Sequence, residues 1–203
     1  FSIPLGIFTA RHAGGRLDRA MTAVNQVLMA IPAFVTGILL TYVFGLVLRW
    51  FVPGNYVSPG DNLGGSLWYF LFPAVSIALP RVAMTVKMLR SSILSELQKD
   101  YVRTSHSRGN SDRSTLYRHV LRNAMGPVVS FLAMTAADIV AGSVVIEQVF
   151  SLPGLGRMLL TSIANRDYPV VQAVVVIVAF WVVLVNLLAD LINQRLDPRL
   201  RLT

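Results

Sequence analysis

The sequence predicts an all-α, polytopic helical membrane protein, and three observations support this fold class. Of the 203 residues, 54% are hydrophobic and only 14% are charged. The mean hydropathy is +0.60, which is too apolar for an ordinary soluble domain. Long apolar runs alternate with short polar segments, and Lys and Arg gather in every second polar segment, as in chains that cross a bilayer repeatedly.

Four apolar runs are long enough to cross a bilayer, which takes about 20 helical residues. They lie at about 21–48, 71–93, 124–146 and 170–192. Pro32 falls inside the first run, and Pro73 and Pro80 fall inside the second, where we expect them to kink packed helices. We find no internal repeat and no linker, so we expect a single transmembrane domain over residues 1–203.

The chain begins with an apolar piece of ten residues, 1–10, and its first residue is Phe1 rather than an initiator Met. Ten residues make up about half of a membrane crossing. Neither a basic n-region nor a signal-peptide cleavage site is present. We therefore expect residues 1–10 to be the inner end of a further span, and the fold to be N-terminally incomplete.

The placement of the 18 Lys and Arg predicts the orientation of the chain. Three lie in 11–19, eight in 87–122 and three in 195–201, whereas Arg81 falls inside an apolar run and only three others lie in the remaining polar segments. Positively charged loops stay in the cytoplasm, so 49–69 and 147–169 are predicted to be external. The net charge of +8 has no aromatic-studded basic face beside it, which disfavours nucleic-acid binding.

The segment 98–122 is the long cytoplasmic loop of this topology, and it is polar and basic. Within it, Gly109 separates two stretches that can each form a short helix, and Asn110, Ser111 and Asp112 are suited to cap the second. Two short helices joined at a glycine would form a docking surface at the base of the membrane helices. Composition alone fits an ordinary basic cytoplasmic loop as well.

The order of residues adds a more specific indication. The relevant runs are Asp100-Tyr101-Val102-Arg103-Thr104, Gly109, Arg118-His119-Val120-Leu121-Arg122-Asn123-Ala124, Pro127-Val128-Val129, Ser151-Leu152-Pro153-Gly154-Leu155-Gly156, Arg166-Asp167-Tyr168-Pro169-Val170-Val171-Gln172 and Leu196-Asp197-Pro198-Arg199. In this order, over essentially the whole chain, they resemble the membrane subunits of ATP-binding-cassette (ABC) importers of the oligopeptide/dipeptide permease family. The segment 98–122 resembles the cytoplasmic EAA loop of that family. Four residues depart from the usual loop: Ser105, His106, Ser107 and Asn110.

The resemblance implies the type I transmembrane-domain fold of ABC importers and a bacterial or archaeal cytoplasmic membrane. It implies a non-catalytic subunit that forms half of a translocation path for oligopeptides or dipeptides. The implied partners are a second homologous permease subunit in a heterodimer, two ATP-binding subunits or domains, and an extracytoplasmic substrate-binding protein. ATP and Mg would bind to the ATPase partners, and this chain would hold no cofactor.

The resemblance also implies which residues form the ATPase-coupling loop. They are Tyr101, Arg103, Thr104, Ser105, His106, Arg108, Gly109, Asn110, Ser111 and Leu116.

The third full span carries the residues that we predict for the path itself. Small residues recur at every fourth position: Ala133, Ala137 and Ala141. Such a stripe lets helices approach closely, and Thr135, Asp138 and Gly142 lie on a neighbouring face. An ionisable residue in mid-membrane is costly and normally faces a bundle interior or a wet cavity. Asp138 is therefore a candidate path residue, and an Asp that only ties helices together is the equally weighted alternative.

Several kinds of chemistry find no support. The chain has no Gly-x4-Gly-Lys-Ser/Thr loop for nucleotide phosphates, no Cys, and three His without ligand spacing, so we expect no metal site. Ser105, His106 and Ser107 adjoin but lack an acid placed for a triad. Two other functions stay open: an importer of nickel or another small solute, and, in a different class, a self-contained channel or secondary transporter.

Overall fold

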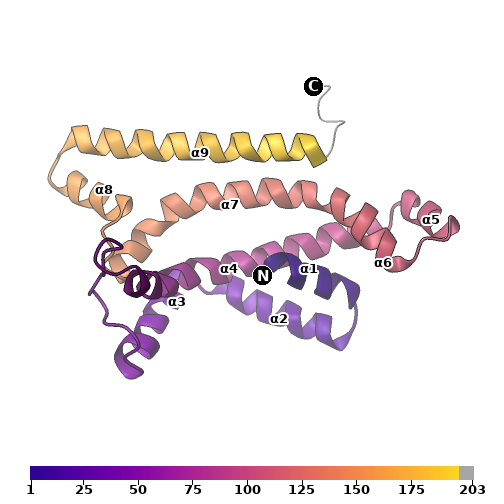
Figure 1. Cartoon of the computed structure of the whole chain (residues 1–203), viewed down its shortest axis with the longest axis horizontal. Helices are drawn as coiled ribbons and strands as arrows, with labels where there is room; N and C mark the ends of the chain where they lie inside the picture. Colours follow the sequence, from indigo (N-terminus) through magenta and orange to yellow (C-terminus); the bar gives the residue numbers. More distant parts are fainter. Residues whose placement is uncertain (197–203) are drawn as a thin grey trace. The chain divides into compact units, whose positions relative to one another are not determined.

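The computed structural model of the chain describes residues 1–196, and the all-α prediction is confirmed there, since those residues form helices and no strands. The elements, drawn in Figure 1, are α1 (Ser2–Arg11), α2 (Arg16–Ala30), α3 (Ala33–Leu40), the π-helix η1 (Thr41–Val47), α4 (Leu63–Leu97), α5 (Asp100–Ser107), α6 (Asp112–Thr115), the π-helix η2 (Leu116–Val120), α7 (Leu121–Val149), α8 (Leu155–Ala164) and α9 (Tyr168–Leu196).

Among residues 1–196, three stretches of helix are long and apolar enough to cross a membrane: Leu63–Leu97, Asp112–Val140 and Tyr168–Arg195. A fourth crossing requires α2 and α3–η1 together, which are bent by 92° at a short break. The sequence predicts one uninterrupted run over 21–48, so this break is a difference. Its cause is Pro32, which has no N–H to donate and excludes a helical conformation from the residue before it. Pro73, Pro80 and Pro127, by contrast, stay inside their helices.

The chain divides into two compact units, each assembled from separate stretches. Unit 1 contains Phe1–Val27, Val82–Thr135 and the chain from Leu184 onward, and unit 2 contains Leu28–Arg81 and Ala136–Val183. The long helices α4 and α7 therefore contribute one end to each unit.

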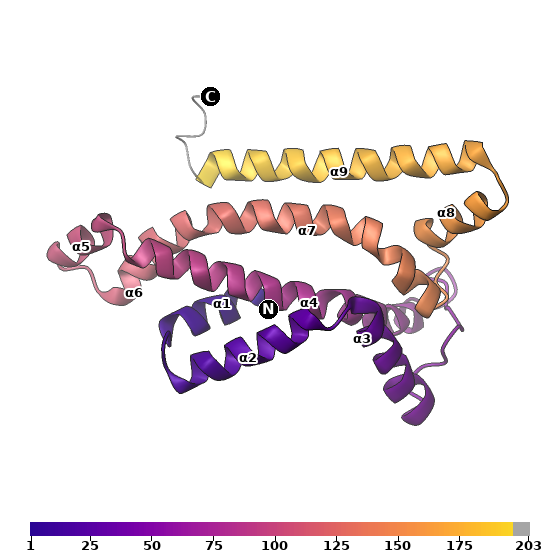
Figure 2. The same ribbon diagram turned by 180° about the vertical axis from the view of Figure 1, so that it is seen from behind.

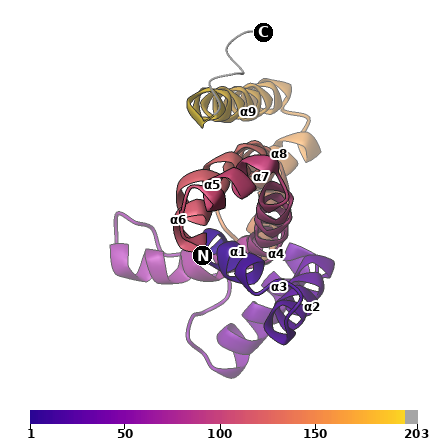
Figure 3. The ribbon, with the colours of Figure 1, turned by 90° about the vertical axis from the view of Figure 1, so that its right-hand side faces the viewer.

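Unit 1 is built on an apolar core that α1, α4, α5, η2 and α7 share. Its buried residues are Ile7, Ala10, Leu89, Ile93, Val102, Leu116, Val120, Ala124 and Val128. Helix α1 lies against α4 (Figures 2 and 3), and a Cβ on Gly6 would come within 2.8 Å of the Leu89 side chain. The α1–α2 turn is tied to α4 by Asp18, which is 3% exposed and accepts two 2.7 Å hydrogen bonds from Arg90.

Unit 2 is organised by aromatic residues around the end of α7. Phe51 stacks on Phe72 with ring centroids 4.2 Å apart. The hydroxyl of Tyr69 donates a 2.6 Å hydrogen bond to the carbonyl of Phe150 and accepts one of 3.1 Å from the Gly54 N–H. These bonds join the loop after η1, the start of α4 and the end of α7.

Helix α8, which follows the end of α7 (Figure 1), begins at a carboxylate of α7. Glu147 is buried and accepts a 2.8 Å hydrogen bond from the backbone N–H of Arg157, in the first turn of α8, and one of 3.0 Å from the Ser143 hydroxyl. A carboxylate at a helix N-terminus satisfies an otherwise unpaired N–H and is favoured by the helix dipole. Gly154 and Gly156 leave the necessary space, since a Cβ on Gly154 would collide with the Glu147 carboxylate and one on Gly156 would lie 2.6 Å from the Val144 Cα.

Gly154→Ala should destabilise the protein by about 1–3 kcal/mol through overpacking against Glu147. The backbone of Gly154, with φ −115° and ψ 174°, suits any residue, so steric contact is the only cost. Thermal unfolding of the purified protein measures the effect. Gly126→Ala is the matched control, because a Cβ there meets nothing within 4 Å. Equal melting temperatures for the two variants would contradict the proposed packing.

The predicted topology can be tested with single cysteines, since the chain contains none. Ser107 and Asp61 are both exposed, whereas Ser105 is buried and would label poorly. Ser107→Cys in inverted vesicles and Asp61→Cys in intact cells should react with an impermeant thiol reagent, and neither should react from the opposite side. Labelling of both from the same side would refute the topology.

Candidate functional site

Helices α5 and α6 form the hairpin that the sequence predicts around Gly109. Helix α5 begins after the extended Lys99 and carries Asp100 in its first turn, where the helix dipole favours an acid. It ends just ahead of Gly109, whose φ is +82°. Glycine adopts this left-handed conformation without a steric penalty, whereas other residues do not. Ser111 caps α6, because its hydroxyl accepts a 3.3 Å hydrogen bond from the Ser114 N–H.

The hairpin is anchored in the core of unit 1 rather than attached loosely to it. Val102 of α5 and Leu116 of η2 are both buried in that core. The hairpin also lies directly beyond the last turns of α4 and the first turns of α7 (Figure 1). A displacement of the hairpin therefore has to displace these ends of α4 and α7 as well, because close-packed interiors yield little.

A buried polar contact closes the hairpin from within. The hydroxyls of Ser105 and Thr115 are 2.9 Å apart, and the Asn110 side-chain amide donates a 3.2 Å hydrogen bond to the Ser105 oxygen. The Asn110 N–H donates to the Ser105 carbonyl at 3.3 Å. Ser105 and Asn110 are two of the four departures from the usual loop, and here they bond to each other. The structure thus buries both Ser105 and Leu116 inside the unit.

Tyr101 joins α5 to the end of α4. Its hydroxyl donates a 2.8 Å hydrogen bond to Glu96, which also pairs with Lys99. Burial and then the Glu96 hydrogen bond raise the pKa of Tyr101 to about 12, while a hydrogen bond with Asn123 acts in the opposite direction. The phenol is therefore neutral at physiological pH and available as the donor.

The remaining predicted loop residues, together with Ser107, which was not predicted, form an exposed polar surface, which we call the hairpin surface. Its members are Arg103, Thr104, His106, Ser107, Arg108, Gly109, Asn110 and Ser111. His106 lies with its Nδ1 3.5 Å from the Asp112 carboxylate, whose side chain is 99% exposed. Both arginines of the surface extend into solvent, so the surface can meet an acidic partner.

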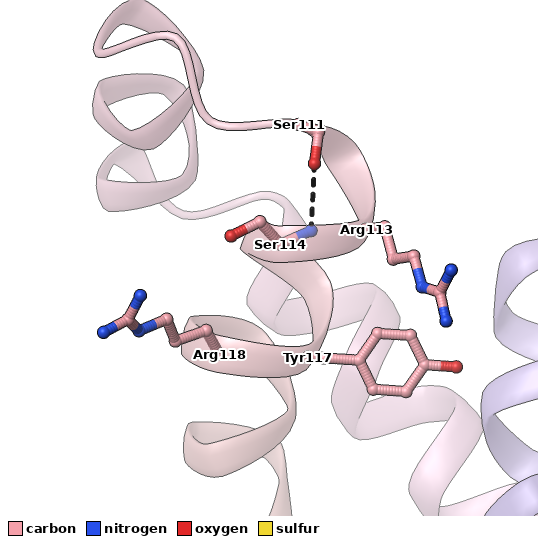
Figure 4. A pocket seen from close by; sticks show the side chains of 5 residues that line it. All are labelled: Ser111, Arg113, Ser114, Tyr117 and Arg118. Atoms are coloured by element: carbon pink, nitrogen blue, oxygen red, sulfur yellow. Dashed lines mark hydrogen bonds between the residues drawn. The ribbon is translucent and has the colours of Figure 1, made fainter.

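Two hollows adjoin the hairpin surface, and the sequence predicted neither. The first, of about 460 Å³, is lined by Ser111, Arg113, Ser114, Tyr117 and Arg118. Figure 4 shows Arg113 and Tyr117 on one side of the turn and Arg118 on the other, so its polar groups do not converge on a small ligand.

The second hollow, of about 340 Å³, lies where the ends of α1 and α4 meet the hairpin. Ile93, Leu97 and Leu116 give it an apolar lining, and its polar lining residues are Arg11, His106, Asp112, Arg113 and Thr115. An apolar depression with charged groups around it has the shape and chemistry to receive a side chain from a docked protein.

The predicted path residues are not part of the hairpin. Asp138 is exposed, and its Oδ2 lies 3.9 Å from Nη1 of Arg81 on α4. Gly142 is exposed too, and a Cβ there would be 3.6 Å from Nη2 of Arg81. Thr135 belongs to unit 1 and is buried, so it does not share their exposure. The sequence shows Arg81 as a charge inside an apolar run but does not identify its partner, because the register between α4 and α7 is a tertiary property.

Other sequence predictions fall partly outside what the structure describes. Of the alanine stripe, Ala133 is buried and Ala137 is half-buried, and the side chain of Ala141 lies outside the described part. The Asp197-Pro198-Arg199 part of the terminal motif also lies beyond the described residues. Within residues 1–196, no group of three or more His, Asp or Glu could hold a metal ion.

Comparison with known proteins bears on the whole chain. The sequence profile described as "Binding-protein-dependent transport system inner membrane component" matches residues 2–202. The chain is 34% identical over 199 residues to the probable peptide ABC transporter permease protein y4tP of Sinorhizobium fredii and 35% over 201 residues to the oligopeptide transport system permease protein AppB of Bacillus subtilis. It is 33% identical over 201 residues to the nickel import system permease protein NikB of Staphylococcus aureus. These matches cover 98%, 98% and 99% of the chain, which spans 64%, 64% and 58% of the relatives' lengths.

Gly109 offers a test that separates backbone strain from contact with a partner. Nothing lies within 4 Å of a Cβ built there, so within this chain only the left-handed conformation matters. Gly109→Val should lower the free energy of unfolding by about 1–2 kcal/mol, and Gly109→Asn, which tolerates this conformation, by much less. Thermal unfolding of both purified variants checks the difference. Equal stability of the two would contradict the hairpin geometry.

Proposed function

Since the chain belongs to the family of binding-protein-dependent transport system inner membrane components, we propose that it forms half of the translocation path of an ATP-driven peptide importer. Members of this family are multi-pass proteins of the cytoplasmic membrane, and the apolar helices of this chain agree with that location. The observation that carries the proposal is the structure of the hairpin. It exposes a basic, polar surface, while Val102 and Leu116 are packed in the core of unit 1.

Such an arrangement can transmit force. Transport through a helical bundle requires at least two states, and a partner can shift the balance between them only through contacts that differ between the states. An ATP-binding subunit bound to the hairpin surface would move the ends of α4 and α7 together with the hairpin. Val102 and Leu116 pack in the same core as these two helix ends. The buried bond between Ser105 and Thr115 keeps the hairpin from absorbing that movement.

The second hollow supports the same partner. A protein that covers the hairpin surface also covers the rim formed by Arg11, His106 and Arg113. The apolar lining could take a Leu- or Phe-like side chain, and the two arginines would favour neighbouring acidic residues. An anchor side chain in a pocket with a polar rim is the usual form of an energetically dominant interface contact.

The complete transporter that we propose contains more than this chain. A second, homologous permease subunit would supply the other half of the path, and the pair is expected to be a heterodimer. Two ATP-binding subunits or domains would bind ATP and Mg and carry out hydrolysis, and this chain would be non-catalytic and free of cofactors. An extracytoplasmic binding protein would deliver the cargo.

Peptides are the cargo that we propose. Two of the relatives are named as peptide or oligopeptide permeases, and one is named as a nickel permease at similar identity. Within the described residues, no cluster of His, Asp or Glu could coordinate a metal ion along a path. Import of nickel is therefore the second candidate, and it is tested by the same uptake measurement with the metal as cargo.

Charge reversal on the hairpin surface tests the proposal. Arg103→Glu with Arg108→Glu should leave the amount of permease in the membrane unchanged, because both side chains are exposed. Co-purification of the ATP-binding subunits and ATP-dependent peptide uptake should both fall at least about tenfold, as expected when interface charges are reversed. Arg19→Glu is the control, since Arg19 is exposed on α2 and belongs neither to the hairpin surface nor to the lining of the two hollows.

Three outcomes would contradict the proposal. Normal assembly and uptake in the double variant would show that the hairpin surface is not the docking surface. Uptake that continues without ATP hydrolysis would favour a channel or a secondary transporter. Uptake of nickel but not of peptides would replace the cargo while retaining the importer.

A further inference from the structure

The ion pair of Arg81 and Asp138 in unit 2 carries an inference beyond the hairpin. Arg81 lies near the middle of α4 and Asp138 near the middle of α7, each more than two helical turns from either end of its helix. Their helices are among those long and apolar enough to span a membrane. Charged side chains at such depth are stable only where they meet water, a cavity or an opposite charge.

The pair is open, unlike the ion pair of Asp18 and Arg90, which also joins two helices. Asp18 and Arg90 make two hydrogen bonds of 2.7 Å, and the Asp18 side chain is only 4% exposed. Arg81 and Asp138 stand 3.9 Å apart, with 61% of the Asp138 side chain exposed. That distance is longer than a charge-assisted hydrogen bond, which measures about 2.7–2.9 Å. The first pair fastens two helices to each other, whereas the carboxylate of the second pair remains accessible to another molecule.

The surroundings of the pair leave room for such a molecule. Gly142 stands one turn after Asp138 and presents no side chain, and the position of its missing Cβ is 3.6 Å from the Arg81 guanidinium. Ala78, almost one turn before Arg81, is exposed and small. At these two positions no bulky side chain blocks the exposed carboxylate.

The chemistry of the pair selects among cargo classes. A carboxylate binds an ammonium group, and a guanidinium donates hydrogen bonds to a carbonyl or carboxylate oxygen. In any peptide the terminal ammonium nitrogen and the first carbonyl oxygen are joined through the Cα and the carbonyl carbon. By standard bond lengths the two atoms lie about 3 Å apart. Arg81 and Asp138, at 3.9 Å, are spaced to meet these two atoms together. A bare divalent metal ion would be repelled by Arg81 and would have only the Asp138 carboxylate of this pair as a ligand.

We propose that Arg81 and Asp138 form a binding site for the free amino terminus of a peptide, with Asp138 on the ammonium group and Arg81 on the adjacent carbonyl oxygen. The proposal rests on the peptide-importer function above and deepens it. In this site the protein contacts only the backbone of the first peptide residue. Binding should therefore require a free amino group. It should not depend on the carboxyl end or on the side chains of the peptide.

Direct binding measurements test the site without the external binding protein. The probes are trialanine, N-acetyl-trialanine and trialanine amide, added at millimolar concentration to the purified transporter complex in nanodiscs and followed by saturation-transfer-difference NMR. Trialanine and its amide should bind equally, and the acetylated peptide should bind at least about tenfold more weakly, because one charge-assisted contact is lost.

Asp138→Asn keeps the shape of its side chain, whereas Arg81→Gln shortens the side chain and removes its charge. Asp138→Asn should weaken trialanine binding about tenfold or more and abolish the preference over the acetylated peptide, and Arg81→Gln should weaken trialanine binding to a smaller degree. Asp190→Asn is the matched control, since Asp190 is an exposed carboxylate on α9. Its binding should equal that of the unsubstituted chain.

The outcomes separate this proposal from the function on which it rests. Equal binding of trialanine and its acetylated form, no binding of either, or unchanged binding in Asp138→Asn would overturn the site. Failure of both variants to assemble would show that the pair only ties α4 to α7, and this too would overturn it. The importer proposal fails by a different result, namely that the complete unsubstituted complex with its binding protein imports no peptide with ATP.

Discussion

The burial of Val102 and Leu116 in the core of unit 1 is the constraint on which the rest of that unit depends. These two side chains stand on either side of Gly109, so a single apolar core fixes both arms of the hairpin. The same core holds the end of α4 through Leu89 and Ile93 and the start of α7 through Ala124. A polar surface that solvent can reach is thereby joined rigidly to two membrane helices. Burial of a few aliphatic side chains, each contributing about 1.5–3 kcal/mol, is enough to make this junction stiffer than a free loop.

Polar groups in this chain are placed according to whether they stabilise a contact or remain able to bind. Asp18 with Arg90 and Ser105 with Thr115 are buried and mutually satisfied, and each fastens one segment to another. Glu147 does the same for α8 by accepting the Arg157 N–H. Arg81 with Asp138 differs in distance and exposure, which is the physical reason to assign it a ligand rather than a fastening role. A buried pair that loses one partner is costly, so exposure distinguishes the two classes.

The segment after the C-terminal end of α7 contains a short motif whose structural role is visible only in the folded chain. The run Ser151–Gly156 reads as a turn in the sequence, with Pro153 and two glycines. In the structure Gly154 and Gly156 are needed because Glu147 and Val144 occupy the space that their side chains would fill. The glycines therefore serve close packing, since Gly154 has an extended backbone that other residues also adopt.

The sequence by itself determined the helical membrane class, the hairpin around Gly109 and a helix start among Asn110, Ser111 and Asp112, because hydropathy, helix capping and left-handed turns are local properties. The structure identifies Ser111 as the cap. The sequence also supported the family, through runs of residues in order. It predicted a kink at Pro32 within one helix but could not predict that the chain bends by 92° between two separate helices there. The size of the bend depends on how the flanking helices pack. Nor could the sequence show that Ser105 lies buried against Thr115, or that Arg81 reaches Asp138, residues separated by a long stretch of chain. Tertiary structure alone decided these pairs, because the rotation and register of one helix against another come from the packing of the whole unit rather than from any local pattern.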